Sequence, residues 1–179
     1  RFTNFNLPLN LQKFDPALGT LTAVEISLTR TGTQTLRYEN RDTIGWNVSL
    51  MGTTTLVVSS SLFVDKTIQS VVNDNVFRTA YDGVLNYSGS SGYRRTFGPF
   101  AETVTIPSSE LSSNLAMFIG TDQFSMNANA TGSALVMGSG DFVFVISTQA
   151  GLQARVTYTY NVAPVCNLSL SSSALTCSN

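Results

Sequence analysis

The stretch LNLQKFDPALGTLTAVEISL, residues 9–28, decides the fold expected for this chain. Apolar and polar residues alternate on either side of its centre, which is the pattern of half-buried strands. The centre, FDPALG at residues 14–19, breaks the alternation. Pro16 fixes its own φ angle and Gly19 tolerates a positive φ, so these residues predict a chain reversal between two strands.

Comparable segments recur along the rest of the chain. Turn-forming residues at 31–32, 52–53 and 73–75 separate short alternating stretches, and YSGSSG at 87–92 predicts a surface loop. Reversals at these spacings predict about ten or more short strands.

Two segments refine this prediction. Residues 142–146, FVFVI, are apolar on both faces, as expected for a central strand. Residues 107–111, PSSEL, predict one short helix, capped by Ser108 or Ser109. The expected fold class is therefore all-β, an antiparallel β-sandwich of jelly-roll type with at most one short helix.

Length and composition indicate one exported domain. We assign residues 1–163 to a single sandwich and residues 164–179 to a Ser-rich tail with Cys166 and Cys177. Charged residues make up only 12% of the chain, in a hydroxyl-rich context that suits an extracellular or cell-surface location. The cysteines can form a disulfide within the chain, pair between subunits, or stay free thiols.

The charge count and the apolar runs of the sequence also limit the possible partners. Ten basic and eleven acidic residues are scattered without a basic stripe, so no nucleic-acid partner is expected. No apolar run approaches the ~18 residues of a membrane span, so no transmembrane segment is expected.

The N-terminal segment, residues 2–11, is the best candidate for assembly. Phe5, Leu7, Leu9 and Leu11 share one face of a strand. Pro8 places that strand at a sheet edge, because proline cannot donate to a ladder. We interpret residues 1–12 as an edge strand that can be exchanged with a neighbouring subunit.

Six motifs in order resemble a known family, the choice-of-anchor E domain of bacterial exported proteins, over residues 7–160. The resemblance implies a secreted, surface-associated β domain without catalytic residues, normally followed by a C-terminal sorting or anchoring segment. After Tyr160 no hydrophobic anchor follows, so we expect either a cleaved anchor or retention by assembly. The motifs are FDPALGTL (14–21) with Val24, YDG (81–83), YSGSSG (87–92), FIGT (118–121), GSG (138–140) and VTYTY (156–160).

The sequence offers little catalytic chemistry. It contains no His, which excludes Ser-His-Asp and Cys-His catalysis and imidazole metal sites. No cofactor and no catalytic residue are assigned. Asp82 and Asp141, beside glycine-rich turns, are candidates for calcium, although Asp82 also fits the first residue of an Asp-Gly turn.

Three functions remain open at this point. The first is a non-enzymatic structural subunit that polymerises into a fimbria-like surface filament or layer by exchanging residues 1–12. A structure in which this strand is fully paired in its own sandwich would argue against the exchange mechanism. The second is a carbohydrate-binding or adhesion module, which requires exposed stacking aromatics. The third is a hydrolase with two carboxylates roughly 5–10 Å apart. The stacking candidates are Trp46, Tyr81, Tyr87 and Tyr93.

Overall fold

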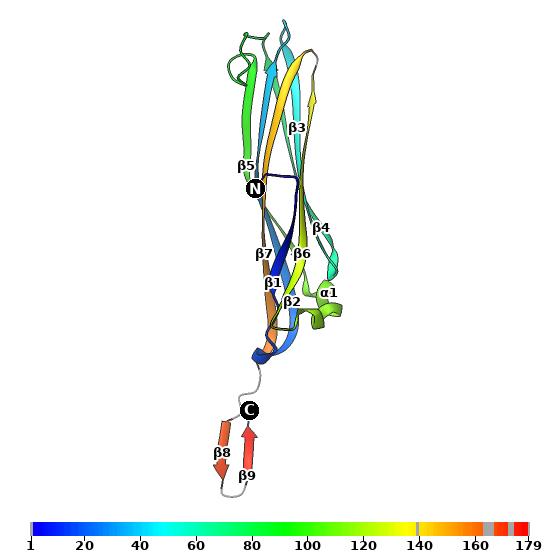
Figure 1. Cartoon of the computed structure of the whole chain (residues 1–179), viewed down its shortest axis with the longest axis vertical. Helices are drawn as coiled ribbons and strands as arrows, with labels where there is room; N and C mark the ends of the chain where they lie inside the picture. The colour runs from blue at the N-terminus through cyan, green and yellow to red at the C-terminus, as the bar shows by residue number, and fades with distance from the viewer. Residues whose placement is uncertain (1, 139, 163–166, 172–173, 179) are drawn as a thin grey trace.

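The computed structural model describes residues 2–138, 140–162, 167–171 and 174–178, and it confirms an all-β sandwich. Two antiparallel sheets, in the strand orders β1-β6-β3-β4 and β5-β2-β7, pack face to face in an elongated body without a closed barrel (Figure 1). The strands are β1 (Phe5–Gln12), β2 (Gly19–Asn40), β3 (Trp46–Ser60), β4 (Phe63–Arg78), β5 (Gly92–Ile106), β6 (Gln123–Met137) and β7 (Phe142–Val162).

The strands are fewer and longer than predicted. β2 alone spans 22 residues and β7 spans 21. The reversals predicted at 31–32, 52–53 and 73–75 are wrong, because β2, β3 and β4 run straight through them.

Close packing explains why two of these positions are glycines. A Cβ on Gly32 would collide with the carbonyl oxygen of Gln149 on β7, and a Cβ on Gly52 would collide with the Gln34 side chain from the opposite sheet. Glycine inside a strand therefore marks close approach here rather than a turn.

The reversal at residues 14–19 is confirmed. β1 leads into a 3₁₀ turn, η1 (Pro16–Leu18), which Asp15 caps: Ala17 N donates to Asp15 Oδ1 at 2.9 Å. Gly19 then adopts a φ of 142° and begins β2 in the other sheet. The turn thus carries the chain from one layer of the sandwich to the other.

The short helix is also confirmed, but its cap is not. α1 (Ser108–Leu111) begins after Pro107, and neither serine side chain caps it. A 3₁₀ segment, η2 (Ser112–Phe118), continues the same excursion beside the lower end of the sandwich (Figure 1). Within the described residues no helix has the length and apolar character to cross a membrane.

The core has two apolar clusters, one in each half of the long axis. The larger, lower cluster lies near α1 and includes Phe118 and Ile26; the smaller, upper cluster includes Tyr38 and Leu50. Between them lies a buried polar layer that contains Arg30, Gln34 and Thr148. Arg30 Nη2 donates to Ser70 Oγ at 3.0 Å, and its Nη1 lies 3.3 Å from Glu102 Oε2.

Strand order settles two predictions about edges. β1 lies at the edge of its sheet, as Pro8 predicted. β7 was predicted to be central from residues 142–146, which is wrong: β2 is the central strand and β7 lies at the edge.

The tail adds a further hairpin. β8 (Asn167–Ser171) and β9 (Ala174–Ser178) pair antiparallel with each other, and among the described residues with no other strand. Cys166 and the side chain of Cys177 lie outside what the structure describes, so the three alternatives for these cysteines stay predictions.

Candidate functional site

One side of the sandwich, formed by the edge strands β4 and β5, is rich in charge. Arg95 of β5 lies 2.8 Å from Asp74 of β4, and the Tyr93 hydroxyl donates to the same carboxylate. Burial alone would raise the pKa of Asp74, but these hydrogen bonds outweigh it and lower that pKa. Charges of this kind are the usual protection of an edge strand against pairing with another chain. The charged residues of β4 and β5 are Asp65, Lys66, Asp74, Arg78, Arg94, Arg95 and Glu102.

The opposite side, formed by β1, β6 and β7, lacks this protection. β1 and β6 contain no charged residue, and β7 contains one, Arg155. We call this side the uncharged edge. Its sequence signal is a long gap between charges: no charged residue occurs between Asp122 and Asp141, or between Asp141 and Arg155. The alternation within single strands does not reveal this gap.

The lower half of the uncharged edge is closed by β1. All eight residues of β1 are in register with β6, from Phe5 opposite Ala130 to Gln12 opposite Gln123. Phe5, Leu9 and Leu11 are half-buried against the lower core, and Leu7 is half-buried with them. An apolar groove of about 250 Å³ remains between this strand and β7, lined by Phe5, Leu7, Leu9, Ala128, Ala150, Gly151 and Leu152.

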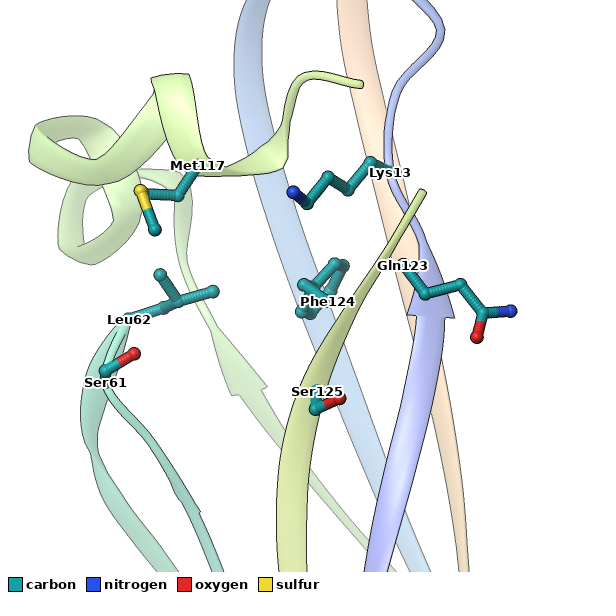
Figure 2. A pocket seen from close by; sticks show the side chains of 7 residues that line it. All are labelled: Lys13, Ser61, Leu62, Met117, Gln123, Phe124 and Ser125. Carbon is teal, nitrogen blue, oxygen red and sulfur yellow. The ribbon is translucent and has the colours of Figure 1, made fainter. Parts of the chain in front are cut away.

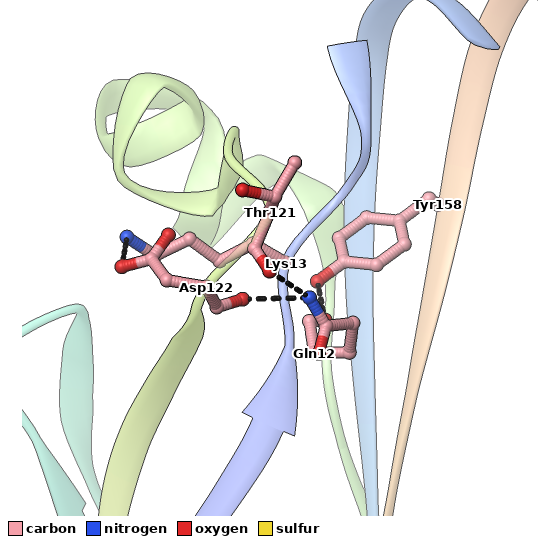
Figure 3. A network of polar contacts seen from close by, with 5 residues as sticks. All are labelled: Gln12, Lys13, Thr121, Asp122 and Tyr158. Atoms are coloured by element: carbon pink, nitrogen blue, oxygen red, sulfur yellow. Dashed lines mark hydrogen bonds and ion pairs between the residues drawn. The ribbon is translucent and has the colours of Figure 1, made fainter. Parts of the chain in front are cut away.

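Polar contacts fasten the C-terminal end of β1 (Figure 3). Gln12 Nε2 donates to the carbonyl oxygens of Thr121 at 2.8 Å and Asp122 at 2.9 Å, and Tyr158 Oη donates to Gln12 O at 2.7 Å. Lys13 Nζ lies 3.0 Å from Asp122 Oδ2, and this hydrogen bond lowers the pKa of Asp122. These contacts join β1 both to residues 121–122, which precede β6, and to β7.

The N-terminal end of β1 is held as well. Asn4 N donates to Ala130 O at 2.7 Å, and Thr3 N donates to Thr148 O at 3.0 Å. Residues 2–4 therefore cross from β6 to β7 at mid-height of the sandwich (Figure 1). Because the strand is fully paired in its own sheet and fixed at both ends, the structure argues against exchange of residues 1–12.

Above this crossing, the uncharged edge is open. Residues 131–137 of β6 pair with β3 on one side, and among the described residues no strand pairs with them on the side of β1. The core-facing residues of β6 change accordingly: Met126 and Ala130 beside β1 are buried, whereas Ala134 and Val136 above it are half-buried. Across from them Phe144 of β7, in the core-facing set, is 42% exposed.

A second concavity lies near the lower end of the sandwich (Figure 2). It has a volume of about 210 Å³, with Phe124 and Leu62 on its walls and the Lys13 ammonium at its rim. That ammonium is paired with Asp122, so the pocket offers a ligand no free charge from Lys13. Its lining residues are Lys13, Ser61, Leu62, Met117, Gln123, Phe124 and Ser125.

The four stacking candidates do not form an exposed row. All are half-buried. Trp46 packs on the upper core, and its Nε1 donates to Asp42 Oδ2 at 3.1 Å, which lowers the pKa of Asp42. The Arg78 guanidinium lies 5.1 Å from the centre of the Tyr93 ring. Tyr81 and Tyr87 belong to loop 79–91.

The two calcium candidates have other contacts: Asp82 bonds a backbone amide, and Asp141 pairs with an arginine. Asp82 Oδ1 accepts from Val84 N at 3.0 Å, the contact of an Asp-Gly turn. Asp141 lies 3.8 Å from Arg41. Within the described residues no group of three or more His, Cys, Asp or Glu side chains is placed to hold a metal ion.

Sequence reasoning also missed Glu39, which organises loop 79–91. Its buried carboxylate accepts from the amides of Tyr87 at 2.6 Å and Asn86 at 3.3 Å, and from Ser91 Oγ at 2.6 Å. Tyr87 has a positive φ of 56°. A glutamate inside a long strand gave no signal of this role, because its partners lie 47 to 52 residues away.

The fold and this site define an all-β sandwich with one side rich in charge and one partly open side whose strands carry a single charged residue, Arg155. No family model, no curated protein and no solved structure matches the chain. The resemblance to the choice-of-anchor E domain therefore stays a prediction.

Proposed function

We propose that this chain is a non-enzymatic structural protein of the cell exterior that assembles with copies of itself into a filament or layer. The open part of the uncharged edge, residues 131–137 of β6 with residues 142–148 of β7, is the observation that carries the proposal. An edge that is long, apolar and uncharged is a template for another strand.

Apolar exposure supports the same conclusion. Leu135 and Met137 on β6 are 47% and 54% exposed, and Phe144 and Val145 on β7 are 42% and 40% exposed. Association at the open edge would remove the core-facing Phe144 from water, at about 25 cal/mol per Å² of apolar surface. The low charge of the chain also lets copies approach closely, because few charges would have to be desolvated.

The proposal is tested by electron microscopy and sedimentation of the full chain and two matched variants. Phe144→Asp places a charge at the open edge, where association would bury it without a partner. Phe77→Asp makes the same change on β4, where Phe77 is 58% exposed on the charged side. Wild type and Phe77→Asp are expected to form regular fibres or sheets, and Phe144→Asp is expected to stay monomeric, with circular dichroism confirming its fold.

Monodisperse wild-type particles of 19.2 kDa at all concentrations would contradict the proposal. In that case a glycan screen becomes the next experiment, since the carbohydrate-binding alternative does not require assembly.

A further inference from the structure

We propose that β8 of one copy adds to the open edge of β6 in the next copy, end to end with that copy's own β1. This inference rests on the proposed function and names the segment that makes the contact.

The residues of β6 that could bond an added strand are found from which side of the strand their backbone N–H and C=O groups face. Ala130 O accepts from Asn4 N, so the carbonyl of Ala130 points to the side of β1. N–H and C=O groups of alternate strand residues point the same way. Gly132, Ala134 and Val136 therefore direct their backbone groups to the open side, where no strand of the described part of the chain pairs with them.

The sequence of β8 resembles that of β1, the strand that fills the lower half of this same edge. β1 contains Asn6-Leu7-Pro8-Leu9, and β8 contains Asn167-Leu168-Ser169-Leu170. In β1 these leucines are half-buried over the core of the sandwich. Leucines at the same spacing in an added strand would cover the half-buried residues of β6 above the crossing.

Length and charge also match. Residues 131–137 of β6 have no strand partner on this side, Thr3 lies beside Gly132 at the lower end of this stretch, and β8 is five residues long. No charged residue follows Arg155, so the whole tail is uncharged like the edge it would join. β8 and β9 pair only with each other among the described residues, and a lone two-stranded hairpin is at best marginally stable in water. The hairpin therefore gains by pairing with a sheet.

The two parts lie at opposite ends of the sandwich. β7 ends at Val162, opposite Gly19 and beside η1 at the lower end, while the open stretch of β6 lies in the upper half (Figure 1). A segment that leaves one copy at its lower end and binds the upper half of another makes a head-to-tail contact that repeats without closing, which builds a filament.

Strand direction agrees with this arrangement. β6 and β7 are joined by a short connection at residues 138–141 and run in opposite directions, and β1 also runs opposite to β6. If two copies have the same orientation and the tail of one copy continues in the direction of its β7, its β8 reaches the second copy antiparallel to the second copy's β6. This is the direction that β1 has relative to β6 within one copy.

Two full-chain variants separate the acceptor from the donor. Ala134→Pro removes an N–H that faces the open side and leaves the ladder to β3 intact, since proline is tolerated where the N–H of an edge strand faces solvent. Leu168→Asn with Leu170→Asn removes the apolar residues of β8. Ser169→Asn with Ser171→Asn is the matched control within the same strand.

Light scattering after size exclusion gives the readout. We expect wild type and the serine control to assemble, and Ala134→Pro and the leucine variant each to remain monomeric. A mixture of these two has one intact donor and one intact acceptor, so it is expected to give a species of two chains, twice 19.2 kDa. The leucine substitutions lie outside the sandwich, so this variant tests the inference even if Ala134→Pro fails to fold.

Assembly of the leucine variant at the wild-type level would overturn the inference and leave the proposed function standing. A wild-type chain that never assembles would instead refute the proposed function, and the inference with it.

Discussion

Replacing Tyr158 by phenylalanine tests whether the lower end of β1 is fastened as described. The Tyr158 hydroxyl donates to Gln12 O at 2.7 Å, and burial raises the pKa of Tyr158 to about 12. Phenylalanine keeps the ring beside Phe14 and removes only the hydroxyl. At pH 8 we expect the free energy of unfolding to fall by about 1 kcal/mol, the usual contribution of one hydrogen bond.

The pH dependence gives a sharper magnitude. A folded-state pKa above the ordinary value of 10 means that the folded chain holds its phenolic proton more tightly than the unfolded chain. The corresponding stability is complete below pH 10 and is lost as the pH rises toward 12. At pH 11 the loss is at most about 1.4 kcal/mol, and solvent screening reduces it because Tyr158 is only half-buried.

Urea unfolding of both chains at pH 8 and pH 11 measures this. Every other titrating group is common to the two proteins, so their difference isolates Tyr158. The advantage of wild type over Tyr158→Phe should shrink with pH and can reverse at pH 11. An advantage that is constant or grows between these two pH values would refute the contact between Tyr158 and the end of β1.

Three further outcomes are expected. Glu39→Gln should weaken the hydrogen bonds to loop 79–91 by about 1.5–3 kcal/mol, seen as faster hydrogen exchange of the two loop amides that Glu39 binds, and unchanged exchange would count against it. Phe118→Ala should cost about 3–5 kcal/mol of unfolding free energy because the ring is fully buried, whereas Met117→Ala, 55% exposed, should stay within about 0.5 kcal/mol. The hydrogen bond from Lys66 lowers the pKa of Glu110, so Lys66→Met should return that pKa toward its ordinary range in an NMR titration. Because the folded-state pKa is lowered, the Lys66–Glu110 pair stabilises the fold above the ordinary carboxyl range, and this stabilisation is lost as the pH falls.

The fold class was predictable because alternation is a local property of the chain. The reversal at 14–19 and the edge position of β1 followed from Pro8, Pro16 and Gly19, whose backbone constraints do not depend on neighbours. Strand length was not predictable in this way. Gly32 and Gly52 have the same local signature as turn glycines, and only the approach of β7 and of Gln34 shows what they accommodate.

The candidate site was predictable only in part. The strand predicted at residues 2–11 does lie at an edge, as β1 from Phe5 to Gln12, but its full pairing with β6 and the contacts at both ends depend on residues more than 100 positions away. Asp74 was assigned to a loop because Asn and Asp favour turns. In the structure it lies in β4, where Tyr93 and Arg95 of another strand bind its carboxylate.

The failed prediction for residues 142–146 bears most directly on function. A strand that is apolar on both faces is typical of a sheet interior, yet β7 lies at an edge with Phe144 and Val145 both about 40% exposed. The sequence pattern therefore indicates more burial than a single copy provides. A strand added beside β6 would lie opposite the core-facing side of β7 and shield Phe144, the same relation that β1 already has to the lower half of β7. The conflict between local pattern and isolated fold is thus what assembly at the uncharged edge would resolve.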